Sequence, residues 1–289
     1  MKQPPCPARN LSYAGSARSR GGKALICLME NATGRRALIR RAQGFEADLA
    51  GGANFFDVMA ARFGLTLDVV KGALADVPHE GPLIVTANHP YGILDGLMMG
   101  HLLSCRRSDF RIMANAVFAG APDLDRYLLP VSFDGGKQAL ATNLETRRAA
   151  LAHLAQGGAI GIFPGGTVST GIRPFARPVD PTWRSFTARL IATSGATVQP
   201  LYFEGHTSRM FQIASHLHMS LRLGLLIRQF GARVDMPVRV AVGAPLGRDI
   251  LDPLAGDAKA MMDFLREATY ELAPEPLEYF NAGYDFEGR

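Results

Sequence analysis

A chain of 289 residues in which 47% are apolar can bury a large core, either as one domain or as two small ones. Its longest notable apolar run, Ala24–Met29, has six residues, whereas a membrane-spanning helix needs about 20, so we predict no spanning segment. Three scattered cysteines, Cys6, Cys27 and Cys105, and the absence of a secretory leader pattern argue against a disulfide framework and against a zinc site. These features predict a protein of the reducing cytoplasm.

Positive charge gathers near the amino end of the chain and negative charge near its carboxyl end. Residues 1–41 carry nine Lys or Arg against one acid, Glu30, whereas residues 251–289 carry nine acids against three bases. In the basic segment, apolar residues such as Leu25 and Leu28 mix with the arginines, as in helices that lie on an anionic membrane surface. The alternative is a solvated basic face on an ordinary core helix. The segment lacks the motifs of nucleic-acid binders, so we predict no nucleic-acid partner.

Hydrophobic periodicity predicts alternating helices and strands along most of the chain. The predicted helices span 22–48, 54–63, 96–105, 138–156, 182–193, 208–230 (with a break near Met219) and 257–272. The predicted strands span 65–70, 83–87, 109–114, 128–133, 159–163, 196–203 and 238–242. The pattern predicts an α/β fold: a mixed, largely parallel sheet flanked by helices. We expect residues 1–63 to form a basic arm and a helical appendage, and residues 64–289 to form the α/β domain.

The first chemical motif follows the most apolar strand. Strand 83–87 runs into Asn88-His89-Pro90-Tyr91-Gly92, and Asp95 stands near the start of the next helix. A histidine beside a carboxylate is the minimum equipment for general base catalysis, because the carboxylate orients the ring and stabilises the imidazolium. Taken alone, the same residues also fit a structural interpretation, in which His89 is a turn residue and Asp95 caps a helix.

A second motif stands at the end of another buried strand, 159–163. There the chain enters Pro164-Gly165-Gly166, and Thr167 and Ser169 follow. Such a turn presents bare backbone N–H groups, which can bind a phosphate or a developing oxyanion. Both motifs are predicted at the carboxyl edge of the sheet, where open α/β sheets bind their ligands.

A third strand end places polar residues, Glu204 and Arg209, after the strand 196–203. Each arginine near these motifs is, by itself, typical of a solvated surface, but together they predict an anionic ligand. The arginines concerned are Arg111, Arg173, Arg177 and Arg209.

Several common signatures are missing from the sequence. It has no G-x-S-x-G elbow, no P-loop, no H-E-x-x-H and no G-x-G-x-x-G. His216 and His218 are too close together and too isolated to predict a metal site. We therefore predict neither a bound metal nor a resident cofactor, and a covalent serine mechanism loses support.

Three motifs together resemble those of the glycerolipid (lysophospholipid) acyltransferase superfamily. They are Asn88–Gly96, Phe163–Ser169 and Pro200–Gly205, and the resemblance covers about residues 65–245. The closest likeness is to the bacterial hemolysin-like branch, which includes acyltransferases of ornithine-lipid synthesis. The resemblance implies a glycerol-3-phosphate acyltransferase-like α/β fold and direct attack of an acceptor on an acyl thioester.

The resemblance also implies partners and a place in the cell. Acyl carrier protein or coenzyme A would bring the acyl group as a co-substrate, and a lyso-lipid hydroxyl would accept it. The protein would be cytoplasmic and peripherally attached to the inner membrane. The alternative is a lipid-binding protein of the membrane surface that has kept the fold without the chemistry.

Roles carry over from the family motif by motif. His89 would be the base and Asp95 its orienting partner. The substrate-binding residues would be Asn88, Arg111, Phe163, Pro164, Gly165, Gly166, Thr167, Ser169, Glu204 and Arg209. The chain departs from the commonest family pattern in having five residues, not four, between His89 and Asp95. It also has Gly165 where the commonest motif has glutamate, and Thr167 where the nearer branch often has an acid.

Overall fold

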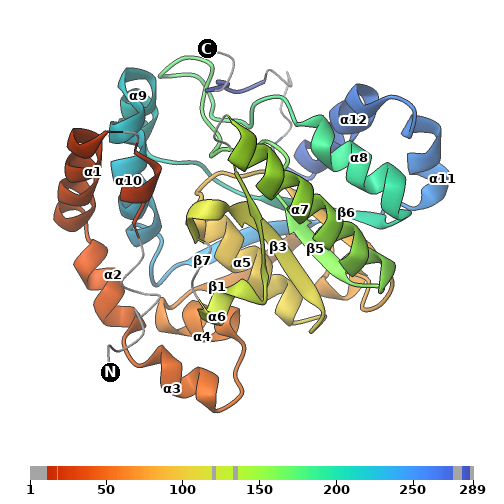
Figure 1. Cartoon of the computed structure of the whole chain (residues 1–289), viewed down its shortest axis with the longest axis horizontal. Helices are drawn as coiled ribbons and strands as arrows, with labels where there is room; N and C mark the ends of the chain where they lie inside the picture. Colours follow the sequence, from red (N-terminus) through yellow and green to blue (C-terminus); the bar gives the residue numbers. More distant parts are fainter. Residues whose placement is uncertain (1–11, 18, 119–121, 133–135, 276–281, 287–289) are drawn as a thin grey trace.

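A computed structural model describes residues 12–17, 19–118, 122–132, 136–275 and 282–286. Within these ranges one seven-stranded sheet crosses the molecule, in the order β1-β7-β6-β2-β5-β3-β4, with helices on both faces (Figure 1). The strands are β1 Thr66–Lys71, β2 Leu83–Ala87, β3 Phe110–Asn115, β4 Leu128–Val131, β5 Ala159–Ile162, β6 Thr197–Phe203 and β7 Pro237–Val242. Neighbouring strands pair in parallel except β6 and β7, so the predicted mixed, largely parallel α/β sheet is confirmed.

The strand directions bring several strand ends to one edge. β2 lies at the centre between β5 and β6, and all three run the same way, as do β3 and β4. Their carboxyl ends therefore meet at one edge of the sheet, which is where parallel sheets present ligand-binding residues. β7 and its neighbour β1 run in the opposite direction.

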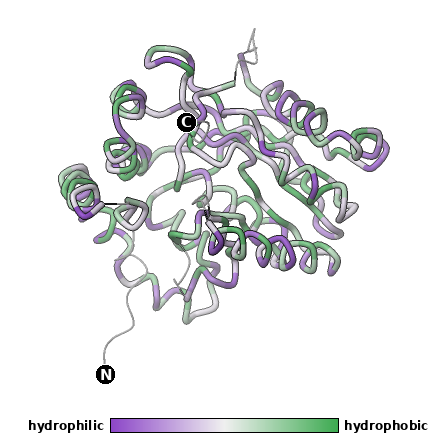
Figure 2. The backbone as a smooth tube through the Cα atoms, turned by 45° about the horizontal axis from the view of Figure 1, so that its top comes forward, coloured by the Kyte–Doolittle hydropathy of each residue, from purple (hydrophilic) through white to green (hydrophobic). Residues whose placement is uncertain are grey.

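The helices form the two outer layers. They are α1 Arg20–Ala32, α2 Arg35–Ala42, α3 Phe45–Ala50, α4 Phe55–Arg62, α5 Ile93–Ser104, α6 Pro122–Asp125, α7 Lys137–Ala155, α8 Ser185–Ser194, α9 Arg209–Leu217, α10 Met219–Gly231, α11 Arg248–Leu251 and α12 Ala258–Tyr270. Successive side chains of a strand point to opposite faces. Accordingly, Leu83 and Val85 of β2 pack in the core under α4 and α5, whereas Ile84 packs under α7, α8 and α12. Figure 2 shows apolar strands through the middle and mixed polar and apolar turns on the surrounding helices.

Two long predicted helices are divided in the structure. The segment predicted at 22–48 forms α1, α2 and α3, because Gly34 and Gly44 adopt left-handed conformations with φ of 116° and 81°. The segment predicted at 208–230 is broken at His218, whose extended backbone separates α9 from α10 and whose side chain caps α10. The helix predicted from residue 96 begins earlier, at Ile93.

The helices before β1 pack on the rest of the chain. α1 lies along α10, where Ile26 is fully buried, and α4 packs on α5 through Phe56. Among the residues that the structure describes, no helix combines the length and the apolar character that crossing a membrane requires.

Candidate active site

Asn88 fixes the point at which the chain leaves β2. Its side-chain amide donates to the carbonyl of Phe203 at 2.9 Å, and its amide oxygen accepts from the N–H of Phe203 at 2.7 Å. This pair of hydrogen bonds to the end of β6 is buried, and it satisfies both the NH₂ group and the carbonyl oxygen of the Asn88 side chain. Asn88 therefore positions the next residue, His89, and does not itself line the cavity described below.

His89 and Asp95 are brought together by the turn between β2 and α5. Nδ1 of His89 lies 3.1 Å from Oδ2 of Asp95, which is fully buried in the first turn of α5. The same oxygen accepts the N–H groups of Tyr91 at 2.7 Å and Gly92 at 2.9 Å. Gly92 has a φ of 82°, and this left-handed residue lets the five-residue loop fold back onto the carboxylate.

Burial sets the electrostatics of this pair. Removal from water raises the pKa of the Asp95 carboxyl, and the contact with His89 and the two N–H bonds oppose that rise. Nδ1 of His89 meets Asp95 at contact distance without a fully aligned hydrogen bond, and no other described residue bonds it. Such pairs often become aligned only when a substrate binds.

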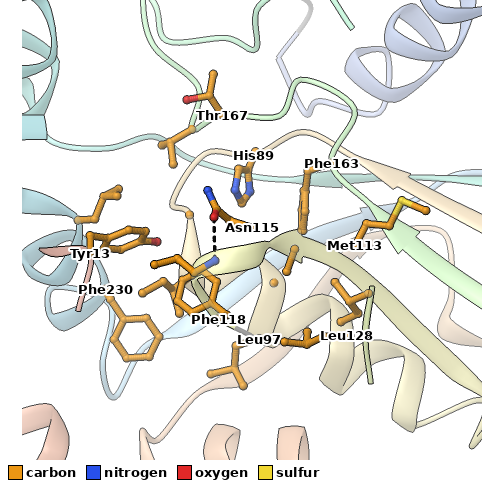
Figure 3. A pocket seen from close by; sticks show the side chains of 18 of the residues that line it. Tyr13, His89, Leu97, Met113, Asn115, Phe118, Leu128, Phe163, Thr167 and Phe230 are labelled. Carbon is orange, nitrogen blue, oxygen red and sulfur yellow. Dashed lines mark hydrogen bonds between the residues drawn. The ribbon is translucent and has the colours of Figure 1, made fainter. Parts of the chain in front are cut away.

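The imidazole of His89 stacks on Phe163, the residue that follows β5. The ring centroids are 4.2 Å apart and the planes differ by 29°. Figure 3 shows the two rings side by side, with Leu97, Leu128 and Phe230 on one side of them and Thr167 on the other. The side chain of His89 is 18% exposed, so a small reactant can reach it from the cavity.

Asp180 joins the two motifs. Its Oδ1 accepts the N–H of His89 at 3.1 Å and the hydroxyl of Ser169 at 2.5 Å, and its Oδ2 accepts the indole N–H of Trp183 at 2.9 Å. Ser169 in turn donates its N–H to the carbonyl of His89 at 2.8 Å. Asp180 is fully buried and was missed by the sequence analysis, because it lies in a segment with no recognisable motif.

Asp180 also accounts for Gly165. A Cβ atom at position 165 would lie 3.2 Å from Cβ, Cγ and Oδ2 of Asp180, closer than nearly all real contacts. The glycine therefore leaves the space that this carboxylate occupies. Where the commonest motif has a glutamate at this position, the present chain buries an aspartate from a later segment against the same turn.

Arg222 of α10 holds the loop beyond Gly166. Its Nη2 donates to the hydroxyl of Thr167 at 3.0 Å and to the carbonyl of Val168 at 2.7 Å, and its Nη1 donates to the hydroxyl of Thr170 at 2.7 Å. Arg222 is 3% exposed, and burial lowers its pKa to about 9. No carboxylate of the described residues forms an ion pair with it. These charge-assisted bonds fix a segment that has no regular structure.

A cavity of about 700 Å³ opens beside His89. That volume lies within the range of ordinary ligand pockets. Most of its wall is apolar and comes from α2, α4, α5, α10 and the strand ends: Leu38, Phe55, Phe56, Met59, Phe63, Ile93, Leu97, Ile112, Met113, Phe118, Leu128, Leu223, Leu226 and Phe230. Three arginines, Arg35, Arg184 and Arg222, also line it, and no Asp or Glu of the described residues does.

The structure separates the residues predicted from the sequence into three groups. His89, Phe163, Pro164, Gly166 and Thr167 line the cavity. Asn88, Asp95, Gly165 and Ser169 are buried behind it. The remaining three, Arg111, Glu204 and Arg209, lie outside the cavity wall.

Each of these three has a different surrounding. Arg111 stands near the amino end of β3, and its positive charge adds to the effect of burial in lowering the pKa of His153. Glu204 forms an ion pair with Arg239 at 2.6 Å. Arg209 is exposed at the start of α9. Arg173 and Arg177 are also exposed. The basic side chains that do reach the cavity come instead from positions that carry no motif.

The fold and the site thus define an α/β protein with an imidazole held against a buried carboxylate, at the carboxyl edge of a mixed sheet and beside an apolar cavity. The model of the acyltransferase family matches residues 52–276, and the chain belongs to this family. The superfamily predicted from the motifs is thereby confirmed, whereas the hemolysin-like, ornithine-lipid branch stays a prediction.

No curated protein sequence gave a match. Among solved structures, the chain is similar to the 1-acyl-sn-glycerophosphate (LPA) acyltransferase PlsC from Thermotoga maritima, with 17% identity and a TM-score of 0.45, over 92% of this chain and 87% of that one.

Proposed function

We propose that this acyltransferase moves a fatty acyl group from an acyl thioester to the hydroxyl of a lyso-lipid, with His89 as general base and Asp95 as its positioning residue. The observation that carries the proposal is the exposure of the His89 ring to an apolar cavity while Asp95 is buried behind it. The apolar wall suits an acyl chain, and the lining arginines suit an acceptor with an anionic headgroup.

The proposed reaction needs no covalent enzyme intermediate. Nε2 of His89 takes the proton of the acceptor hydroxyl as its oxygen attacks the thioester carbonyl carbon. The tetrahedral oxyanion then collapses, the carbon–sulfur bond breaks, and the thiolate recovers the proton from His89 to leave as a free thiol. Asp95 stabilises the imidazolium formed in between.

The oxyanion needs hydrogen-bond donors near the second motif. The N–H of Gly166 is committed to the carbonyl of Phe163 at 3.0 Å, so it is not a donor to substrate. The N–H of Thr167 makes no hydrogen bond with the described residues, and Thr167 lines the cavity. Because its hydroxyl accepts from Arg222, the hydroxyl proton also remains available for donation. We assign the oxyanion contact to Thr167.

The proposal is tested by incubating the purified protein with palmitoyl-coenzyme A or palmitoyl-acyl carrier protein and a lysophospholipid. We expect release of free thiol, measured with a thiol reagent, matched by formation of the diacyl product in a mass spectrum. A panel of acceptors with phosphate, carboxylate and uncharged headgroups then reports the preferred lipid. Lyso-lipid binding without thiol release for any donor would favour the non-catalytic, lipid-binding alternative.

Asp95→Asn is expected to lower kcat by about 10²–10⁴-fold, because the amide cannot stabilise the imidazolium and favours the wrong tautomer. The variant should fold as well as the parent, since one amide oxygen can still accept the N–H groups of Tyr91 and Gly92.

The raised pKa of the buried Asp95 carboxyl is tested by measuring the free energy of unfolding in denaturant at several pH values. Because the pKa of Asp95 is raised in the folded state, its protonated form favours folding at low pH, and this contribution is lost as pH rises through the folded pKa. The stability of the parent relative to Asp95→Asn should therefore fall between acidic and neutral pH. For the kinetic prediction, a kcat of Asp95→Asn within a few-fold of that of the parent would contradict the role of Asp95 as the positioning residue of His89.

A further inference from the structure

Helix α9 carries apolar side chains on its outer face. Met210, Ile213 and Leu217 recur at the spacing of one helical stripe and are 45%, 37% and 71% exposed. The inward face includes Gln212 and Ser215, both buried and hydrogen-bonded. The same inward face buries Phe211 and Ala214 in the core, so α9 has apolar side chains on both sides. A surface helix normally carries polar side chains on its outer face, so the exposed stripe of α9 suits a nonpolar environment.

The loop at 171–177 continues this apolar surface. Ile172 and Phe175 are 53% and 80% exposed, and Phe175 is the most exposed large apolar side chain of the described residues. The loop adjoins the last turn of α9, since Nε2 of His216 lies 3.0 Å from the carbonyl of Gly171.

The start of α1 stands next to the start of α10, directly beyond α9 (Figure 1). A Cβ atom at Gly22 would lie 3.2 Å from the hydroxyl of Ser220. Here Leu25, Leu28 and Met219 are exposed to 38%, 68% and 44%. We call the exposed side chains of α1, α9, Met219 and the loop 171–177 the apolar-basic face.

The charge on this face is mainly positive, although one exposed acid, Asp285, lies close to it, because the ring of its neighbour Tyr284 packs edge-to-face on His216 of α9. Residues 205–234 contain no Asp or Glu, and residues 19–42 and 163–204 contain only Glu30, Asp180 and Glu204. Glu30 and Asp180 are fully buried, and Glu204 pairs with Arg239. The exposed ionisable residues of the face are basic: Arg20, Lys23, Arg173, Arg177 and Arg209.

We propose that the apolar-basic face docks the protein on an anionic lipid bilayer, with Phe175 and Leu217 as its main apolar anchors. Exposed apolar side chains ringed by five basic ones, against a single exposed acid, Asp285, close to α9, match a membrane interface in both polarity and charge. A protein partner or a second copy would more often meet mixed charge. The proposal rests on the proposed function, because docking would bring the cavity close to its lipid substrates. Helix α10 connects this face to the cavity, since Met219, Arg222 and Leu223 of α10 line the cavity.

Binding to vesicles tests the proposal, with the full chain and vesicles of phosphatidylcholine with or without phosphatidylglycerol. We expect co-sedimentation with the anionic vesicles only, weakened by high salt. The double variant Phe175→Ser/Leu217→Ser should bind about tenfold more weakly or worse, because two apolar anchors are lost. The matched control is Leu140→Ser/Leu144→Ser on α7, where the side chains are 61% and 49% exposed. This control should bind like the parent.

The charge of the face has its own variant. Lys23→Gln/Arg173→Gln should reduce the preference for phosphatidylglycerol, since each basic residue near the surface adds attraction to anionic lipid. Equal binding of parent and anchor variant, or no binding of the parent, overturns the proposal. A dimer in size-exclusion chromatography that the anchor variant abolishes also overturns it, in favour of a second copy.

Docking and catalysis fail separately. Phe175 and Leu217 do not line the cavity, so the anchor variant should keep its rate with a short-chain, water-soluble acceptor and lose it with acceptor embedded in vesicles. If the parent acylates the soluble acceptor but does not bind vesicles, the proposed function is supported and the docking proposal is contradicted. If the parent binds vesicles but acylates neither acceptor, the docking proposal is supported and the proposed function is contradicted.

Discussion

His89→Ala is expected to lower kcat for acyl transfer by about 10²–10⁴-fold, the usual contribution of a positioned general base. The variant should fold normally, because the bonds that hold this loop use the backbone of His89. Its N–H donates to Asp180 and its carbonyl accepts from Ser169, and neither depends on the imidazole. KM should change little, since the ring supplies only a small part of the cavity wall.

The experiment measures kcat and KM by thiol release, together with the melting temperature. His79→Ala is the matched control, because His79 is exposed and outside the cavity, and this variant should retain full activity. Activity of His89→Ala within a few-fold of the parent would exclude His89 as the base. Loss of folding in this variant would also be unexpected, and His89→Gln, which keeps a polar side chain of similar length, would then report on catalysis.

The first two motifs were accessible to sequence reasoning because local patterns encode them. Apolar runs ending in Asn88-His89-Pro90 and in Pro164-Gly165-Gly166 mark two strand ends, and parallel strands bring such ends to one edge. His89 and Asp95 are joined by a single short turn, so their spacing in the sequence alone indicates that the two side chains can lie close together.

The supporting contacts were not accessible, because they join residues far apart in the chain. Asp180 meets His89 across 91 positions, and Arg222 meets Thr167 across 55. Neither residue carries a local signature: an aspartate after a proline-rich loop and an arginine in a helix are both typical of solvent-exposed sites. Arg111 shows that a basic residue can stand in a strand near the motifs and still lie outside the cavity wall, so its role as a substrate-binding residue stays a prediction.

The second large effect is expected from Asp180→Ala. Three buried donors, the N–H of His89, the hydroxyl of Ser169 and the indole of Trp183, would lose their acceptor. An unsatisfied buried donor costs about 1–3 kcal/mol, so we expect the free energy of unfolding to fall by about 3–5 kcal/mol. Typical domains have about 5–15 kcal/mol in total, so the variant should be marginally stable.

Trp183 makes this prediction directly observable. It is the only tryptophan of the chain and is 3% exposed, so its fluorescence reports on the surroundings of the Asp180 carboxylate. Denaturant titrations followed by this fluorescence give the free energy of unfolding for the parent and Asp180→Ala. Asp263→Ala is the control, because its pair with Lys259 is exposed to solvent and should contribute little to stability.

Asp180→Asn separates support of the site from support of the fold. The amide oxygen can still accept from His89 and Ser169, but the amide nitrogen then faces the indole N–H of Trp183, so one donor is left unsatisfied. We expect a loss of about 1–3 kcal/mol, small enough to leave a folded enzyme for kinetics. Replacing Trp183 by Phe in the same chain removes the opposed donor and should recover part of this loss, a non-additivity expected of residues in contact. Because the Trp183→Phe variants lack the only tryptophan, the unfolding of all four variants of this cycle is followed by far-ultraviolet circular dichroism. Full additivity, or an Asp180→Ala variant as stable as the control, would show that Asp180 does not join the two motifs energetically, whatever its contacts in the folded chain.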